Sequence, residues 1–155
     1  MQEPVTSRVS RLIAGGVSGF LLTLIGLAVA APLFNSELLY HFFSPACHQI
    51  SARCYSIENQ PVALCVRCLW IYAGLGIGHL FFAFVRLDER NSPVLLFLSI
   101  GLMAGDVVME TLGFYHSLPI VRSATGFLFG FGCSRFVLMG LTQLCLRTEI
   151  KQTPA

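Results

Sequence analysis

Cysteine and histidine residues are concentrated in one short stretch of this 155-residue chain. Cys65 and Cys68 are three positions apart, and at the start of a helix or in a turn that spacing lets both sulfur atoms face one point. Cys47 and His48 precede them by the length of a loop and can supply the opposite side. Zinc takes four ligands of these kinds in a tetrahedron. The predicted ligands of a zinc-like divalent metal ion are Cys47, His48, Cys65 and Cys68.

Polar residues beside these four are expected to support the metal rather than to bind it. Gln49, Arg53 and Arg67 are close to the ligands in the sequence. From there they can orient the ligands or offset the negative charge of the thiolates. Cys54 is the reserve ligand if His48 points away from the metal.

The same cysteines also permit redox chemistry. A thiolate at the N-terminus of a helix is stabilised by unpaired backbone N–H groups, and Arg67 adds positive charge beside it. In this interpretation Cys65 and Cys68 are the catalytic pair of a thiol–disulfide oxidoreductase. A third interpretation is structural, because an oxidising compartment allows Cys47–Cys54 or Cys65–Cys68 disulfides that only hold the stretch together. The residues themselves leave all three open.

Charged residues interrupt the later apolar part of the chain. Asp106 and Glu110 are one helical turn apart and share a face. Arg122 comes directly before the next apolar segment, and Arg135 lies within it. Charges are costly in lipid and mark either a function or an ion pair. We expect Asp106 to pair with Arg135. The alternative is an acidic path for a metal ion or protons that leads in from the cysteine-rich stretch.

Long apolar segments must position these residues. Of the chain, 55% is hydrophobic and only 12% charged. The apolar segments span residues 12–34, 64–85, 93–115 and 123–146. Each approaches or exceeds the roughly 20 residues that a membrane-spanning helix needs, and helices leave no backbone group unpaired in lipid. The sequence therefore predicts an all-α fold, a four-helix transmembrane bundle that forms a single membrane domain over residues 1–155, with a cysteine-rich loop over residues 35–63.

Glycine pairs four residues apart recur in every apolar segment. They are Gly15 and Gly19, Gly74 and Gly78, Gly101 and Gly105, and Gly126 and Gly130. This spacing places a smooth stripe on one face of a helix, where a second helix can approach closely. One such pair in each segment favours a tightly packed bundle.

Positive charges predict the orientation. Those flanking the segments on one side are Arg8, Arg11, Arg86, Arg90, Arg147 and Lys151. Because such residues stay in the cytoplasm, we expect a multi-pass protein of the cell inner (plasma) membrane with both termini cytoplasmic and residues 35–63 and 116–122 outside. A net charge of +2 is too small to indicate a basic nucleic-acid-binding surface. The expected partners are the lipid bilayer and, with it, a membrane-protein partner or a second copy of the chain.

The arrangement of four segments, with two cysteines at the start of the second, resembles the quinone-linked disulfide oxidases of the bacterial inner membrane. This resemblance implies a quinone as the cofactor of the redox interpretation. The second cysteine pair of those enzymes lies in the later external loop, where this chain has no cysteine.

A second resemblance rests on longer strings of residues. They are Cys47-His48-Gln49, then Leu64-Cys65-x-Arg67-Cys68-x-x-Ile71-Tyr72-x-Gly74, and later Asp106, Gly113 and Arg122-x-x-Thr125-Gly126. Over roughly residues 40–132 the chain resembles an uncharacterised family of small bacterial and archaeal membrane proteins, catalogued as a domain of unknown function. The resemblance implies a membrane fold and a metal or thiol site, and it supplies no activity.

The sequence therefore predicts a membrane protein with a Cys/His metal site at the outer membrane face, serving metal handling. The alternatives are a quinone-linked thiol–disulfide oxidoreductase and a passive subunit of a larger membrane complex. The chain carries no fingerprint for a nucleotide, haem or flavin cofactor. Whether it is an enzyme is left open at this point.

Overall fold

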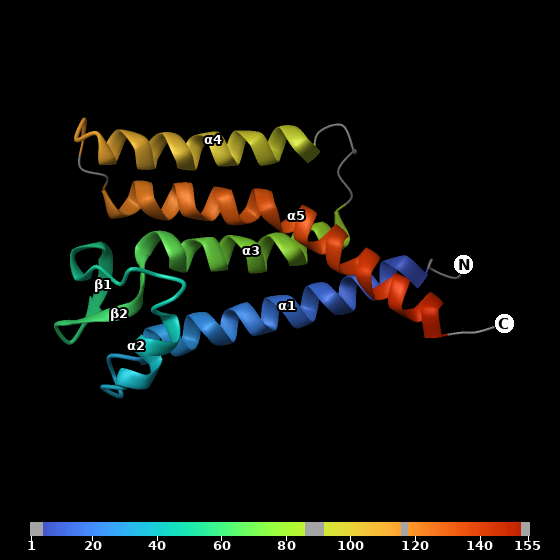
Figure 1. The fold of residues 1–155 in the computed structure, drawn as a ribbon, viewed down its shortest axis with the longest axis horizontal. Coiled ribbons are helices and arrows are strands. Elements are labelled where there is room, and N and C mark those ends of the chain that lie inside the picture. Colours follow the sequence, from blue (N-terminus) through green and yellow to red (C-terminus); the bar gives the residue numbers. More distant parts are fainter. Residues whose placement is uncertain (1–4, 86–91, 116–117, 153–155) are drawn as a thin grey trace.

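Helices long and apolar enough to cross a membrane run side by side in the computed structural model of the chain, which describes residues 5–85, 92–115 and 118–152 (Figure 1). They are α1 (Val5–Ala30), α3 (Val66–Phe84), α4 (Ser92–Thr111) and α5 (Pro119–Gln152). The predicted four-helix transmembrane bundle is confirmed.

The helix ends differ from the predicted ones for local reasons. α1 stops at Ala30 rather than at residue 34, because Pro32 has no N–H to continue the helical hydrogen bonds. α4 stops at Thr111 rather than at residue 115, because Gly113 adopts a φ of 77° and turns the chain away from the helix. α5 begins at Pro119, four positions before the predicted start, and proline suits the first turn of a helix.

The predicted loop over residues 35–63 contains regular structure. Its elements are α2 (Glu37–Phe43), the 3₁₀ helix η1 (Ser51–Arg53), β1 (Cys54–Ile57) and β2 (Gln60–Cys65). The two strands form an antiparallel hairpin, and its two turn residues, Glu58 and Asn59, have φ values of 50° and 62°. Two left-handed residues in a row form the turn type that matches the twist of a hairpin. We call the part from α2 to β2 the hairpin end of the molecule.

A small apolar core attaches the hairpin end to the bundle. Its buried members come from the end of α1, from α2 and from β2, and include Ala28, Phe43, Val62 and Leu64. Val62, Ala63 and Leu64 are all buried although strand neighbours point to opposite faces, so β2 is covered on both sides. This packing fixes the end of β2, where α3 begins.

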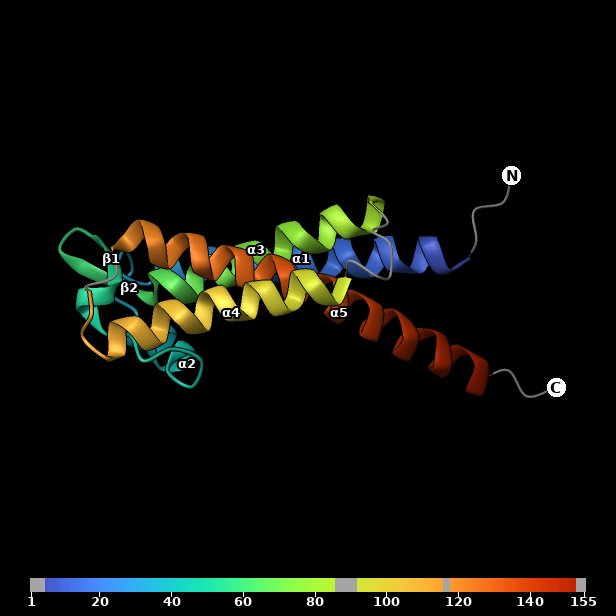
Figure 2. The same ribbon diagram turned by 90° about the horizontal axis from the view of Figure 1, so that it is seen from above.

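α3 is the central helix, packed mainly against α5 and α1, while α4 packs against α5 (Figures 1 and 2). A methyl group added at Gly74 or Gly78 would collide with α5, and one at Gly126 or Gly130 would collide with α3. The predicted close approach is therefore confirmed for these two helices. It is wrong for the pairs on α1 and α4, where nothing lies within 4 Å of an added methyl group.

The start of α1 and the end of α5 lie at the same end of the bundle, opposite the hairpin end (Figures 1 and 2). Four spans require this arrangement. Arg86 and Arg90 are two of the positive charges on which the predicted orientation rests, and they lie outside the described residues. Which end faces the cytoplasm therefore stays a prediction from charge.

Candidate metal centre

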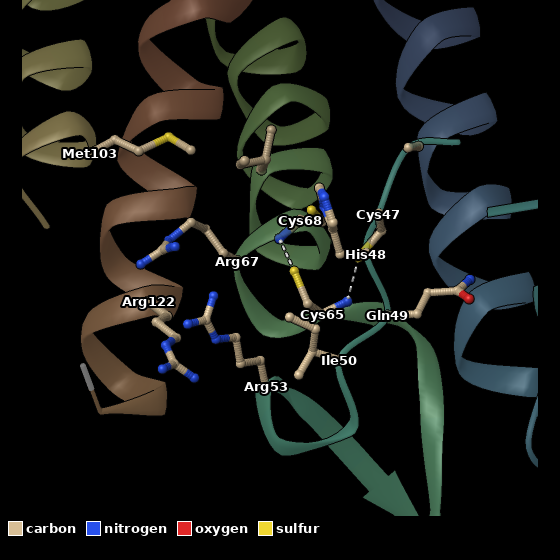
Figure 3. A pocket seen from close by; sticks show the side chains of 12 residues that line it. Cys47, His48, Gln49, Ile50, Arg53, Cys65, Arg67, Cys68, Met103 and Arg122 are labelled. Atoms are coloured by element: carbon tan, nitrogen blue, oxygen red, sulfur yellow. Dashed lines mark hydrogen bonds between the residues drawn. The ribbon is translucent and has the colours of Figure 1, made fainter. Parts of the chain in front are cut away.

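Three cysteine sulfurs converge at the hairpin end (Figure 3). Cys47 comes from the segment after α2, Cys65 ends β2, and Cys68 lies in the first turn of α3. Their Sγ atoms all lie within 4.8 Å of one another. The expectation that Cys47 lies close to the Cys65–Cys68 pair is thus confirmed. We call Cys47, Cys65 and Cys68 the sulfur cluster.

Cys65 joins the β-hairpin to α3. It is the last residue of β2, paired with Cys54 across the hairpin, and also the N-cap of α3. Its backbone N–H donates to the Cys47 Sγ at 3.2 Å, and its own Sγ accepts from the Cys68 backbone N–H at 3.5 Å. Backbone donors aimed at sulfur favour thiolates, which are the form that binds metals.

The electrostatics of the cluster agree with this geometry. The pKa of the Cys65 thiol is lowered to about 5 from its ordinary value of 9.0. The largest cause is the hydrogen bond from the Cys68 side chain; burial opposes it, and backbone donors and Cys47 add to it. A helix N-terminus stabilises a thiolate in the same way. The hydrogen bond from the Cys68 thiol therefore favours the thiolate form of Cys65.

Gln49 holds the Cys47 segment in place without reaching the sulfurs. Its side-chain amide donates to the Tyr40 carbonyl at 2.7 Å and to the Ala63 carbonyl at 3.0 Å, which ties the segment to α2 and β2. Its own backbone has a φ of 49°. Tyr40 in turn donates through its hydroxyl to the Pro61 carbonyl at 2.5 Å. Gln49 therefore fixes the backbone of the segment that carries Cys47.

The remaining predicted ligand, His48, and the reserve ligand, Cys54, lie outside the cluster. His48 is exposed, and within the described residues only the three cysteines bring their ligand atoms together here. The Cys54 thiol donates to the Ile50 carbonyl at 3.2 Å. Burial, followed by the neighbouring thiols Cys47 and Cys65, raises the pKa of Cys54 to about 11. The pKa of the Cys68 thiol is raised as well, chiefly by its hydrogen bond to the Cys65 sulfur. Cys54 is therefore set apart from the cluster by its position and not by its pKa.

Arginines and carboxylates form a second group beside the sulfurs. Glu110 forms ion pairs with three arginines, at N···O distances of 2.5 Å to Arg122, 3.2 Å to Arg67 and 3.3 Å to Arg53. Asp106 forms an ion pair with Arg67. The carboxylate side chains are only 4% exposed for Asp106 and 9% for Glu110. Both carboxylates of α4 are therefore paired, with arginines from η1, α3 and α5, and the three arginines outnumber them by one.

The expected Asp106–Arg135 pair is wrong. Asp106 is paired with Arg67, and it also accepts hydrogen bonds from the Tyr115 hydroxyl and, at 3.3 Å, from the Thr125 hydroxyl. Thr125 is therefore the α5 residue level with Asp106. Arg135 follows Thr125 by ten residues, which is about 15 Å along a helix. The sequence analysis assigned no role to either hydroxyl, although Thr125 stands one turn after Arg122.

A pocket of about 310 Å³ separates the two groups (Figure 3). Figure 3 shows the guanidinium groups of Arg53, Arg67 and Arg122 gathered on one side and the sulfur cluster on the other. We call these three arginines the arginine wall. His48 also lines the pocket, as do the apolar side chains of Ile50 and Met103. The site thus joins soft metal ligands to an accessible, positively charged space.

The family is established by direct comparison. A family described as predicted membrane protein, DUF2085, matches residues 47–136. The chain belongs to this family. An uncharacterised protein of Methanocaldococcus jannaschii is 34% identical over 108 residues, which cover 68% of this chain and 69% of the relative. No solved structure matches the chain. The family expected from the sequence is confirmed, and the stretch matched by DUF2085 contains both the sulfur cluster and the arginine wall.

Proposed function

We propose that this membrane protein binds a zinc-like divalent metal ion through Cys47, Cys65 and Cys68 and serves in metal handling. The observation that carries the proposal is the convergence of three sulfurs within 4.8 Å, from the segment after α2, the end of β2 and the first turn of α3. Thiolates and imidazole are ligands that zinc prefers. Backbone donors to two of the sulfurs support the thiolate form.

The fourth coordination position distinguishes handling from a purely structural role. Structural zinc sites are closed by four protein ligands, whereas sites that exchange ligands keep one position open. The sulfur cluster supplies three ligands and borders the pocket. His48, which follows Cys47 and lines the same pocket, is the protein group that can close the tetrahedron. Arg53 and Arg67 offset the negative charge of the thiolates from the opposite wall.

The orientation of the site belongs to the same proposal. Arg8, Arg11 and Arg147 flank the end with the termini, and Arg53, Arg67 and Arg122 lie at the hairpin end. The positive-inside preference counts Lys and Arg residues, and Arg86, Arg90 and Lys151 add to the first group, which then outnumbers the second. We infer that the hairpin end faces outward from the cell's inner membrane.

Metal analysis of the purified full-length protein tests the proposal. The expected result is one zinc ion per chain, with metal retention abolished in Cys65→Ser or Cys68→Ser, because two thiolates do not complete the site. Cys133→Ser is the matched control, because this α5 cysteine lies outside the sulfur cluster. His48→Ala should weaken retention less than a cysteine change. A metal-free protein whose Cys47, Cys65 and Cys68 all stay reduced would sink the proposal.

Thiol–disulfide chemistry is the second candidate, favoured by the lowered pKa of Cys65 at the N-cap of α3. In this scheme Cys65 and Cys68 form a disulfide and pass two electrons and two protons to a quinone. A thiol count before and after reduction separates the candidates. Purified protein that lacks metal and gains two thiols on reduction would favour the redox scheme, and zinc with unchanged thiols would favour metal handling.

A further inference from the structure

One wall of the pocket, the arginine wall, carries a positive charge that the neighbouring carboxylates do not cancel. Its three guanidinium groups face two carboxylates, so one positive charge of three is left over on that wall, opposite the Cys65 sulfur. Neither Asp106 nor Glu110 is among the residues that line the pocket, and both are nearly buried behind the arginines. A molecule that enters the pocket therefore meets guanidinium groups and not carboxylates.

The arginine wall also has hydrogen-bond donors to spare. Each of its arginines uses one terminal nitrogen, Nη2, for the carboxylates. For residues that the structure describes, the Nη1 atoms make no hydrogen bond or ion pair, and the Nε atoms of Arg67 and Arg122 are buried without a partner. A guanidinium has five N–H donors in a planar fork that matches a carboxylate. The Nη1 groups are therefore the donors that remain for an acceptor in the pocket, whereas the two buried Nε atoms are closed off from it.

The dimensions and the opposite wall narrow the ligand further. A space of about 310 Å³ lies at the lower end of small-molecule sites and suits a compound of a few carbon atoms. Ile50, Ile71 and Met103 give it apolar sides, and the sulfur cluster closes it opposite the arginines. We propose that the pocket binds a small carboxylate-bearing anion, with its carboxylate on the arginine wall and its other end against the sulfur cluster. This goes beyond the proposed metal site, because the arginines bind the anion whether or not a metal is present.

Two alkylating reagents of almost equal size test the proposal. Iodoacetate carries a carboxylate and iodoacetamide carries a neutral amide, and in both reactions a thiolate sulfur displaces iodide. The measurement is the ratio of their rate constants at Cys65, read by mass spectrometry on the full-length protein after metal removal. Any change in the thiolate fraction alters both rates equally, so the ratio reports on carboxylate binding alone. The reference is the same ratio for the neutral thiol 2-mercaptoethanol.

We expect the ratio at Cys65 to exceed the reference by about tenfold, the factor that one charge-assisted hydrogen bond gives. The iodoacetate rate should saturate with concentration, and acetate at constant ionic strength should slow iodoacetate but not iodoacetamide. A ratio equal to that of the reference thiol, with no saturation, would overturn the proposal. An elevated ratio that acetate does not reduce would overturn it too, because long-range attraction would then suffice.

Arg53 is the residue to change, because its side chain is 47% exposed and Glu110 keeps two other arginines. Arg53→Gln should bring the ratio most of the way back to the reference, and Arg53→Lys should keep part of the preference. Arg147→Gln, which removes an exposed charge from the far end of α5, is the matched control and should leave the ratio unchanged. Equal ratios in Arg53→Gln and the wild type would contradict the assignment.

The metal-loaded protein provides an independent test of anion binding. After Co²⁺ substitution, mercaptoacetate should shift the absorption of the bound ion at about one tenth of the concentration that 2-mercaptoethanol requires. Absence of any bound metal speaks against the proposed function only, since the alkylation ratio is measured without metal. Nanodiscs with and without phosphatidylserine identify the source of the anion. Loss of the high ratio with this lipid points to a headgroup, and its persistence points to a free organic acid.

Discussion

Cys65 and Cys54 face each other across the hairpin, yet their thiols have opposite properties. The Cys68 side chain and the N-terminus of α3 lower the pKa of Cys65 to about 5, whereas burial raises the pKa of Cys54 to about 11. Alkylating reagents attack thiolates. A pH series therefore distinguishes the two residues within one protein.

In metal-free protein, we expect Cys65 to react with iodoacetamide at a nearly constant rate from neutral pH downward and to slow as the pH falls through about 5. The sign follows from the lowered pKa, because the charged form persists until the pH drops below it. Cys54 should react appreciably only as the pH rises toward about 11. Mass spectrometry of the labelled peptides measures both. A Cys65 profile centred near 9.0, the ordinary thiol value, would contradict the N-cap geometry.

The Arg67–Asp106 pair is expected to contribute to stability only as a pair. Arg67→Met leaves Asp106 without its cation and should lower the free energy of unfolding by roughly 3–5 kcal/mol. The double variant with Asp106→Leu should lose much less, because no uncompensated charge remains. Denaturant unfolding in detergent measures both. Arg135→Met is the control, and a loss there as large as for Arg67→Met would restore the pairing that the structure contradicts.

At this scale the sequence identifies the cysteines but not the partners of the carboxylates. The spacing of Cys65 and Cys68 requires only a helix start, which local pattern predicts well. The partner of Asp106 depends on where two helices end, and each predicted end was one turn away from the real one. One turn of helix decides which arginine is level with a carboxylate. The exposed position of His48 depends on how the hairpin end packs, and the spacing of residues in the sequence does not predict that packing.

At the scale of helices, the glycine pairs also show that sequence spacing does not predict which helices become neighbours. All four stripes look alike in the sequence, but only those of α3 and α5 face each other. The stripes of α1 and α4 face open space around the described chain. Which helices become neighbours depends on the connections at the hairpin end and between the spans. The hairpin itself was missed because its strands are short and one of them is covered on both faces, which removes the alternating pattern.

Gly130 provides a test of the α3–α5 contact. A methyl group there meets the backbone of Ile71 and Leu75, which cannot rotate away. Gly130→Ala should therefore destabilise the protein by about 1–3 kcal/mol through overpacking. Gly101→Ala is the matched control, because the added methyl group meets nothing within 4 Å and alanine favours a helix. Thermal unfolding measures both. Equal effects of the two changes would contradict the packing.

On the scale of the whole molecule, composition and hydropathy were sufficient to predict the fold class. Few charges and long apolar segments leave a helical bundle as the economical solution in lipid. The bundle places its sulfur cluster and arginine wall together at one end, remote from the start of α1 and the end of α5 (Figure 1). The two ends thus differ in chemistry, and a definite orientation is needed for the site to meet its ligands.

The orientation prediction is that both termini lie in the cytoplasm. A fluorescent protein fused after residue 155 should fluoresce, and a phosphatase that needs the oxidising side should stay inactive there. The positive charges at that end supply the physical reason. Fusions within residues 58–59, the turn of the hairpin, should give the reverse pattern. An active phosphatase at the C-terminus would invert the topology.

The ion pair between α3 and α4 also has a consequence for the order of synthesis. Arg67 is synthesised 39 residues ahead of Asp106, so α3 reaches the membrane before α4, which carries its neutralising partner. An unpaired arginine near a span opposes insertion. A nascent chain that stops within residues 86–91 should therefore hold α3 loosely and be extracted by alkali, and extension through residue 111 should anchor it. We therefore expect the third span to complete the insertion of the second.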